Sequence, residues 1–158
     1  MKEELNFEEA PLRYAGVATL LRSPLVNDPS GVDITLIGVP CDGATESRPG
    51  PREIRNMSSL TRSGHHVTRV NPYELCNVAD VGDVNFSNPF DLQQCFADIT
   101  DFYSKICAAG AVPLSVGGDH SISLPSACSV CVYIGGLDCR AFMPNAMILQ
   151  SIHSIVVL

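Results

Sequence analysis

Basic residues are scarce in this sequence, and charged residues of either sign are few. Ten Lys and Arg stand against 17 Asp and Glu, which gives a formal net charge of −7. A nucleic-acid partner needs a basic stripe that neutralises phosphates, and no segment of the chain concentrates lysine and arginine in this way. We therefore expect no nucleic-acid partner. The acidic balance is compatible with a cationic small-molecule ligand.

The sequence also lacks the features of a membrane or exported protein. Its first ten residues, MKEELNFEEA, are acidic and contain neither the apolar core of a signal peptide nor the arginine-rich pattern of a transit peptide. The long uncharged stretch 141–158 is interrupted by proline, asparagine, glutamine, serine and histidine, which makes it a poor membrane span. We therefore expect a cytoplasmic protein that does not contact a membrane.

Paired cysteines are another missing feature. There are seven cysteines, an odd number with irregular spacing, so a disulfide framework is a poor interpretation and reduced cytosolic thiols are a better one. Cys128 and Cys131 have CxxC spacing. No second CxxC or histidine pair follows them, so we do not expect a zinc site.

What the chain does contain is an alternation of strand-like and helix-like apolar segments, which is typical of an α/β domain. With 158 residues, 46% of them hydrophobic, it is long enough to bury a real core. Short apolar runs predict strands, and apolar residues at helical spacing predict helices that start at Pro51 and at Asn88-Pro89. The predicted strands are 34–39, 67–70, 78–84 and 112–116. This alternation indicates βαβ units and a mostly parallel sheet.

Composition divides the chain into three parts. Residues 1–30 form a leader that ends in a turn-rich segment, and residues 31–125 carry the strand and helix pattern. In the remaining tail, 126–158, the only charged residues are Asp138 and Arg140, and the pattern of helices and strands is lost. We expect one partial domain at 31–125, flanked by a leader and a divergent tail.

The strongest local signal is the motif Gly117-Gly118-Asp119-His120, which follows a predicted strand. Ligands of open parallel sheets bind outside the carboxyl ends of the strands, and paired glycines allow the backbone to turn tightly there. His120 would offer a neutral imidazole to a metal, and Asp119 would orient that ring. The motif alone also fits a tight turn with a hydrogen-bonded histidine.

Other polar residues have plainer interpretations. Arg48, Arg52 and Arg55 lie around the start of a predicted helix, where arginines usually face solvent or pair with nearby acids such as Glu53. Two aspartates, Asp80 and Asp83, stand at the end of a predicted strand. Carboxylates in such places often accept hydrogen bonds from turn backbone, and we expect this role rather than metal binding.

The motifs together resemble one enzyme family. The segment 112–123, with Gly-Gly-Asp-His at its centre, resembles the first metal-binding motif of the ureohydrolase superfamily, which includes arginases, agmatinases, guanidinobutyrases and formiminoglutamases. The segments 38–55 and 78–84 resemble the agmatinase and guanidinobutyrase branch. The resemblance extends roughly over residues 10–125.

This resemblance implies a fold and a chemistry. The fold would be the N-terminal half of a three-layer α/β/α domain with a mostly parallel sheet. The chemistry would be that of two manganese ions, which activate a bridging hydroxide for attack on a guanidinium carbon and release urea and an amine. The substrate would be a small linear guanidino compound such as agmatine or guanidinobutyrate. His120 matches a terminal manganese ligand, and related enzymes are usually homo-oligomers.

The sequence departs from the family pattern in two places. The Asp-x-His-x-Asp and Asp-x-Asp motifs that supply the other ligands do not occur, so the metal site is incomplete in this chain. The loop that would carry substrate contacts, with Arg48 and Gly50, is shorter than in the family, because Pro51 follows Gly50 directly. Two functions therefore stay open: an amidinohydrolase, or a catalytically inactive truncated homologue that binds full-length subunits. An open strand edge would also lower stability and favour association.

Overall fold

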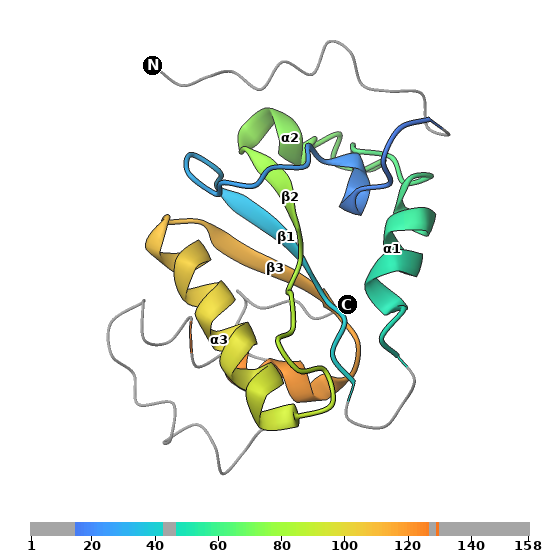
Figure 1. Cartoon of the computed structure of the whole chain (residues 1–158). Helices are drawn as coiled ribbons and strands as arrows, with labels where there is room; N and C mark the ends of the chain where they lie inside the picture. The colour runs from blue at the N-terminus through green and yellow to red at the C-terminus, as the bar shows by residue number, and fades with distance from the viewer. Residues whose placement is uncertain (1–14, 43–46, 127–128, 130–158) are drawn as a thin grey trace.

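The computed structural model describes residues 15–42, 47–126 and 129, and within them the chain forms a parallel three-stranded sheet (Figure 1). The strands are β1 (Ile34–Val39), β2 (Val78–Asp83) and β3 (Val112–Gly117), in the order β2-β1-β3. Ile34 lies opposite Val78 on one side and Val112 on the other. Since all three strands run in the same direction, their carboxyl ends meet at one edge of the sheet.

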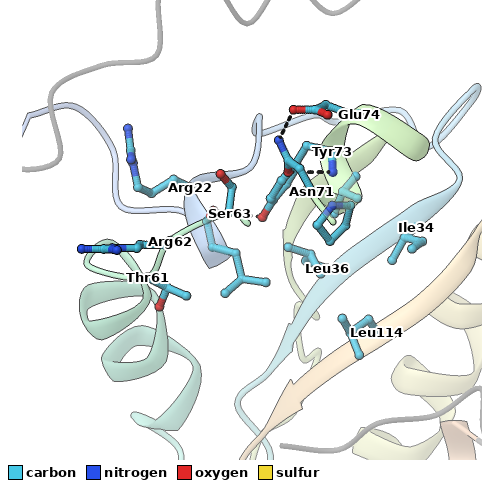
Figure 2. A pocket seen from close by; sticks show the side chains of 13 residues that line it. Arg22, Ile34, Leu36, Thr61, Arg62, Ser63, Asn71, Tyr73, Glu74 and Leu114 are labelled. Atoms are coloured by element: carbon cyan, nitrogen blue, oxygen red, sulfur yellow. Dashed lines mark hydrogen bonds between the residues drawn. The ribbon is translucent and has the colours of Figure 1, made fainter. Parts of the chain in front are cut away.

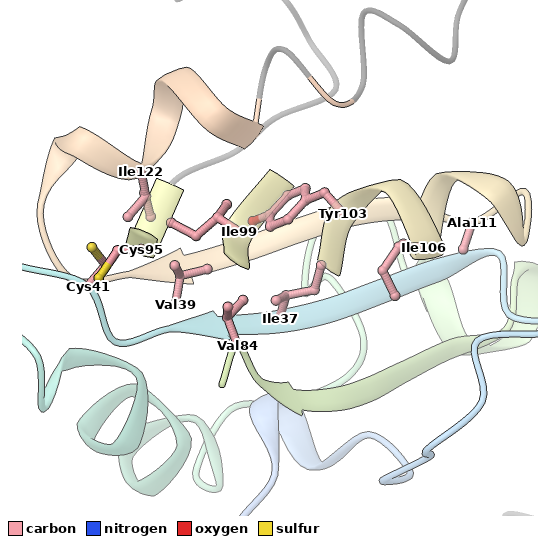
Figure 3. Packing of buried hydrophobic residues seen from close by; sticks show 10 residues of the cluster. All are labelled: Ile37, Val39, Cys41, Val84, Cys95, Ile99, Tyr103, Ile106, Ala111 and Ile122. Carbon is pink, nitrogen blue, oxygen red and sulfur yellow. The ribbon is translucent and has the colours of Figure 1, made fainter. Parts of the chain in front are cut away.

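Helices cover both faces of this sheet. The α-helices are α1 (Gly50–Ser58), α2 (Pro72–Leu75) and α3 (Leu92–Ala108), and the short 3-10 helices are η2 (Leu20–Arg22) and η3 (His120–Ile122). Figure 3 shows α3 on one side of the sheet and α1 with η2 on the other. The predicted α/β class, parallel sheet and three-layer arrangement are confirmed. Among the described residues, no helix is long and apolar enough to span a membrane.

The core has two parts because β1 is buried on both faces. Ile37 and Val39 are fully buried in a cluster under α3, whereas Leu36 belongs to a second cluster that includes Leu20 of η2. A strand covered on both faces is apolar along its whole length, which is why 34–39 was recognisable from sequence. The cluster under α3 (Figure 3) contains Ile37, Val39, Cys41, Val84, Cys95, Ile99, Tyr103, Ile106, Ala111 and Ile122.

Helix α3 begins later than predicted. Its N-cap is Asp91, whose carboxylate accepts hydrogen bonds from the backbone N–H groups of Gln93 and Gln94 at 3.0 and 3.2 Å. Asn88 instead closes the preceding turn, where its Oδ1 accepts from the backbone N–H of Phe90 at 3.1 Å. The prediction that Asn88-Pro89 opens the helix is therefore wrong by one turn. Both residues are good caps, and only the fold selects between them.

The predicted strand 67–70 is also wrong. Residues 61–70 are exposed and form a local turn, in which the His65 N–H donates to the Val70 carbonyl and the Arg69 N–H to the His65 carbonyl, both at 2.9 Å. Arg69 has a φ of 60°, in the left-handed region. These local bonds satisfy the backbone without a neighbouring strand. The short helix α2, which the sequence pattern did not indicate, follows with Asn71 as its N-cap.

The two outer strands differ in how their edges are covered. At β2, the Asp80 N–H donates to the Pro24 carbonyl at 2.8 Å, and the Val26 N–H donates to the Asp80 carbonyl at 2.9 Å. The segment assigned from sequence to a leader thus packs along β2. At β3, no strand of the described part of the chain pairs with the outer edge, and Val112 is 48% exposed. An open edge of this kind is expected for the amino-terminal half of a larger sheet.

A buried hydrogen bond joins α3 to β3 and gives a first prediction. The Tyr103 hydroxyl and Ser115 Oγ are hydrogen-bonded in the core, and burial raises the pKa of Tyr103. Tyr103→Phe leaves the Ser115 hydroxyl without this partner, so we expect the free energy of unfolding to fall by about 1–3 kcal/mol. Urea denaturation of Tyr103→Phe, Ser115→Ala and the double variant measures it. Strictly additive losses would show that the two hydroxyls do not interact.

Candidate functional site

The turn that leaves β3 packs against the end of β1 at the carboxyl edge of the sheet. The Gly118 N–H donates to the Val39 carbonyl at 2.9 Å, and the Asp119 N–H donates to the Cys41 carbonyl at 3.1 Å. These two bonds extend the β1–β3 pairing beyond the last strand residue. The Gly-Gly-Asp-His motif therefore occupies the edge where parallel sheets bind their ligands.

Two glycines allow three segments to converge at this edge. A Cβ at Gly118 would lie 1.8 Å from the Cys41 carbonyl oxygen, and a Cβ at Gly50 would lie 2.8 Å from the Gly117 carbonyl oxygen. Any side chain at these positions would push the end of β1, the start of α1 and the end of β3 apart. The structure thus brings the predicted loop residue Gly50 next to the turn that carries His120.

His120 and Asp119 have separate partners. His120 is exposed, and its Nδ1 lies 3.2 Å from Ser123 Oγ, so Nε2 is the nitrogen available to a metal. Asp119 is the N-cap of η3: its Oδ1 accepts from the Ser121 backbone N–H at 2.9 Å and also from the Ser121 hydroxyl. The role of Asp119 in orienting the imidazole stays a prediction.

The Arg48 side chain points to the loop before α3. Its Nη2 donates to the Pro89 carbonyl at 3.0 Å, and its guanidinium carbon lies 5.7 Å from the centroid of the exposed Phe90 ring. This is a cation–π geometry. The contacts of Arg48 therefore hold its loop against the β2–α3 connection, and a role in substrate contact stays a prediction.

The donor set of the described residues does not fit a two-manganese centre. Within the described residues, no group of three or more His, Cys, Asp and Glu side chains lies close enough to hold a metal ion. A single imidazole from His120 cannot hold two divalent cations with useful affinity. Asp138 and His153 lie outside the described residues. Among the described residues, His120 is the one that matches a ligand of the family motif, and no catalytic step follows from it.

An ion-pair network that the sequence did not reveal anchors α1 to β2. Arg55 Nε and Nη2 donate to the two oxygens of Asp80 at 3.0 and 3.1 Å, and Arg55 Nη1 donates to Asp83 Oδ1 at 2.5 Å. Burial alone would lower the pKa of Arg55, but its hydrogen bonds with the two aspartates raise it. Arg55 thus pairs with acids as expected, but these acids are Asp80 and Asp83 rather than Glu53.

Asp80 is the centre of this network. It is fully buried and also accepts from the backbone N–H groups of Leu20 and Gly82, both at 2.8 Å. The bond to Gly82 is the turn contact predicted from sequence. The signal for the remaining contacts was a carboxylate inside an apolar strand, because a buried charge requires a partner.

A separate hollow lies over the amino-terminal part of the sheet, on the face that packs against η2 (Figure 2). It has a volume of about 900 Å³, and its floor contains Ile34 and Val78, the first residues of β1 and β2. Arg22, Arg62 and Glu74 also line it, between η2, the end of α1 and α2. Because Ile34 and Val78 are at the amino ends of their strands, this hollow is not part of the site at the carboxyl edge.

Comparison with known proteins shows the family. The model of the arginase family matches residues 32–138, which is more than half of the chain. The chain belongs to the arginase family. Within this family, guanidinopropionase from Pseudomonas aeruginosa is 48% identical over 127 residues, which cover 78% of this chain and 39% of that enzyme. The chain thus spans about two fifths of this relative, and the resemblance seen in the motifs is confirmed.

Solved structures agree with this membership of the arginase family. Proclavaminate amidino hydrolase from Streptomyces clavuligerus superposes with a TM-score of 0.72 at 31% identity, over 77% of this chain and 42% of that one. Trypanosoma cruzi formiminoglutamase, solved with Mn²⁺, has a TM-score of 0.62 at 20% identity, over 74% of this chain and 41% of that one. The second likeness bears on the fold alone.

Proposed function

We propose that this chain supplies the amino-terminal part of an amidinohydrolase, which hydrolyses a linear guanidino compound such as agmatine or guanidinobutyrate to urea and an amine. The observation that carries this proposal is the convergence of the Gly50 segment and the Gly117–His120 turn at the carboxyl edge of the sheet. The names of two relatives, guanidinopropionase and proclavaminate amidino hydrolase, support the substrate class.

Manganese is the metal that this proposal calls for, because the segment around Gly117–His120 resembles the first metal-binding motif of the ureohydrolases. When bound, such metal ions would lower the pKa of a coordinated water. His120 would be one ligand through Nε2, with Nδ1 held near Ser123. The other ligands would have to come from outside the described residues or from another polypeptide.

A second candidate function is a catalytically inactive homologue that binds full-length subunits. Two observations favour it: the described residues hold no cluster of three metal-binding side chains, and the outer edge of β3 is unpaired in the part of the chain described. Under either function we propose a cytoplasmic protein that forms homo-oligomers when its sheet is complete.

Metal analysis combined with an activity assay separates the two functions. The purified chain is loaded with manganese and dialysed, and bound metal and urea release from agmatine and guanidinobutyrate are measured on the same sample. Two equivalents of manganese with urea release would establish the enzyme and would mean that ligands exist beyond His120. Negligible metal and no urea would favour the inactive homologue.

A chimera tests whether this chain's part of the site is competent. Residues 32–126 replace the matching segment of P. aeruginosa guanidinopropionase, which then supplies the remainder of an arginase-family domain. We expect the chimera to bind manganese and release urea, and His120→Ala to remove most of both. The control is His66→Ala, a change at an exposed histidine outside the strand edge. Equal effects of the two substitutions would contradict a metal-binding role for His120.

A further inference from the structure

Two buried thiols meet beneath the turn that carries His120. Cys41 lies just after the end of β1 and Cys95 lies in the first turns of α3, and each is only 3% exposed. Both belong to the apolar cluster under α3, Cys95 affects the ionisation of Cys41, and Figure 3 draws the two side chains at the same end of the cluster. The two residues are far apart in the sequence, so only the fold reveals the pair.

The two thiols influence each other in the reduced state. Cys95 Sγ donates to the Asn88 carbonyl at 3.5 Å, and Cys41 lies close enough to Cys95 for the second thiol to affect its ionisation. Burial, together with the neighbouring Cys95, raises the pKa of Cys41 to about 11. The thiolate is the reactive form of cysteine, so Cys41 is unreactive at neutral pH while the core is closed.

We propose that Cys41 and Cys95 form a redox-sensitive pair, which is converted to an intramolecular disulfide by a low-molecular-weight disulfide such as oxidised glutathione. The thiolate of one cysteine attacks the external disulfide when α3 opens transiently, forms a mixed disulfide and releases one glutathione thiolate. The second cysteine then loses its proton and displaces the other glutathione. The two protein thiols are oxidised by two electrons, and one glutathione disulfide is reduced to two glutathione molecules.

The disulfide would fix the candidate metal site to α3. The Cys41 carbonyl accepts the Asp119 N–H at 3.1 Å, and Gly118 packs so closely on Cys41 that a Cβ there would overlap its carbonyl oxygen. A covalent bond between Cys41 and Cys95 therefore ties α3 to the backbone on which the Gly117–His120 turn rests. It also closes a long loop of the chain, which stabilises the folded state by restricting the unfolded one.

The chain offers matched control cysteines. Cys107 is equally buried in α3, and burial raises its pKa without the involvement of a second cysteine. Cys76 is half-buried, and its Sγ donates to the Pro72 carbonyl at 3.2 Å. Neither should form a disulfide with Cys41 in the folded protein.

The experiment uses the full chain in which Cys128, Cys131 and Cys139 are serine, so that four thiols remain. The protein is incubated with oxidised glutathione in mildly alkaline buffer, blocked with iodoacetamide, and analysed by intact mass and by peptide mapping without reduction. We expect a mass lower by two hydrogens than that of the reduced protein in a sample taken before blocking, a linked peptide joining Cys41 to Cys95, and a higher urea midpoint that dithiothreitol reverses.

The variants decide whether the pair is specific. Cys107→Ser should form the same linked peptide, whereas Cys95→Ser and Cys95→Ala should end as a mixed disulfide or remain reduced, with no rise in midpoint. Circular dichroism confirms that each variant is folded. A linked peptide that appears only when urea unfolds the protein, or one that joins Cys41 to Cys76 or Cys107 in the folded protein, would overturn the proposal.

Discussion

Arg55→Ala should lower the free energy of unfolding by about 3–5 kcal/mol. The substitution removes the two guanidinium donors to Asp80, which is fully buried, and leaves its negative charge without a cation. It also releases Asp83 and thereby the end of β2 from α1. Since a domain of this kind is stable by only about 5–15 kcal/mol, the variant should be largely unfolded in moderate urea. Urea denaturation followed by circular dichroism measures the difference.

The matched control is Arg52→Ala, on the same helix. Arg52 is exposed, so its loss should change the free energy of unfolding by no more than about 0.5 kcal/mol. Arg55→Lys keeps the charge but loses the planar pair of donors to Asp80, and we expect an intermediate loss. If Arg55→Ala and Arg52→Ala unfold at the same urea concentration, the network does not anchor α1.

Gly118→Ala should be the most damaging small change at the candidate site, with a loss of about 3 kcal/mol. The added Cβ would meet the Cys41 carbonyl oxygen at 1.8 Å and the Cys41 carbonyl carbon at 2.8 Å. Both are backbone atoms, so no side-chain rotation relieves the overlap. Relief requires the turn to leave the end of β1, which breaks the bonds that position His120. The same urea experiment detects the loss.

Gly64→Ala is the control for this prediction. A Cβ at Gly64 would meet no heavy atom within 4 Å, so the variant should be as stable as the parent within about 0.5 kcal/mol. In the chimera with guanidinopropionase, Gly118→Ala should also weaken manganese binding, whereas Gly64→Ala should not. A stable Gly118→Ala variant with normal metal binding would mean that the turn does not rest on Cys41 as described.

The strands, and the position of the Gly-Gly-Asp-His motif at the carboxyl edge of the sheet, were predictable because they depend on local sequence pattern. Buried parallel strands are apolar along their length, and this identified 34–39 and 112–116 almost to the residue. Helix α1 was found from Pro51, although it starts one residue earlier at Gly50. The segment 67–70 failed because β-branched residues alone do not make a strand, and a strand needs a neighbour to pair with.

The contacts that organise the site were not predictable because they join distant segments. Asp80 was identified as a turn acceptor, but nothing local to it indicates that Arg55 supplies its counter-charge. Cys41 and Cys95 were counted only as reduced thiols, since their proximity depends on how α3 crosses the sheet. Such pairs become visible once the order of the strands is known.

That order has a consequence for how the chain folds as it is synthesised. The sheet runs β2-β1-β3, so β1 is its central strand. Since β1 is also the first strand in the sequence, it is synthesised before both of its neighbours. An emerging β1 is apolar on both faces and has no partner until β2 arrives, and it remains half-covered until α3 and β3 have followed. Pairing of this kind is long-range and therefore slow. The apolar faces of β1 in the nascent chain thus have to be shielded from other chains until β3 is complete.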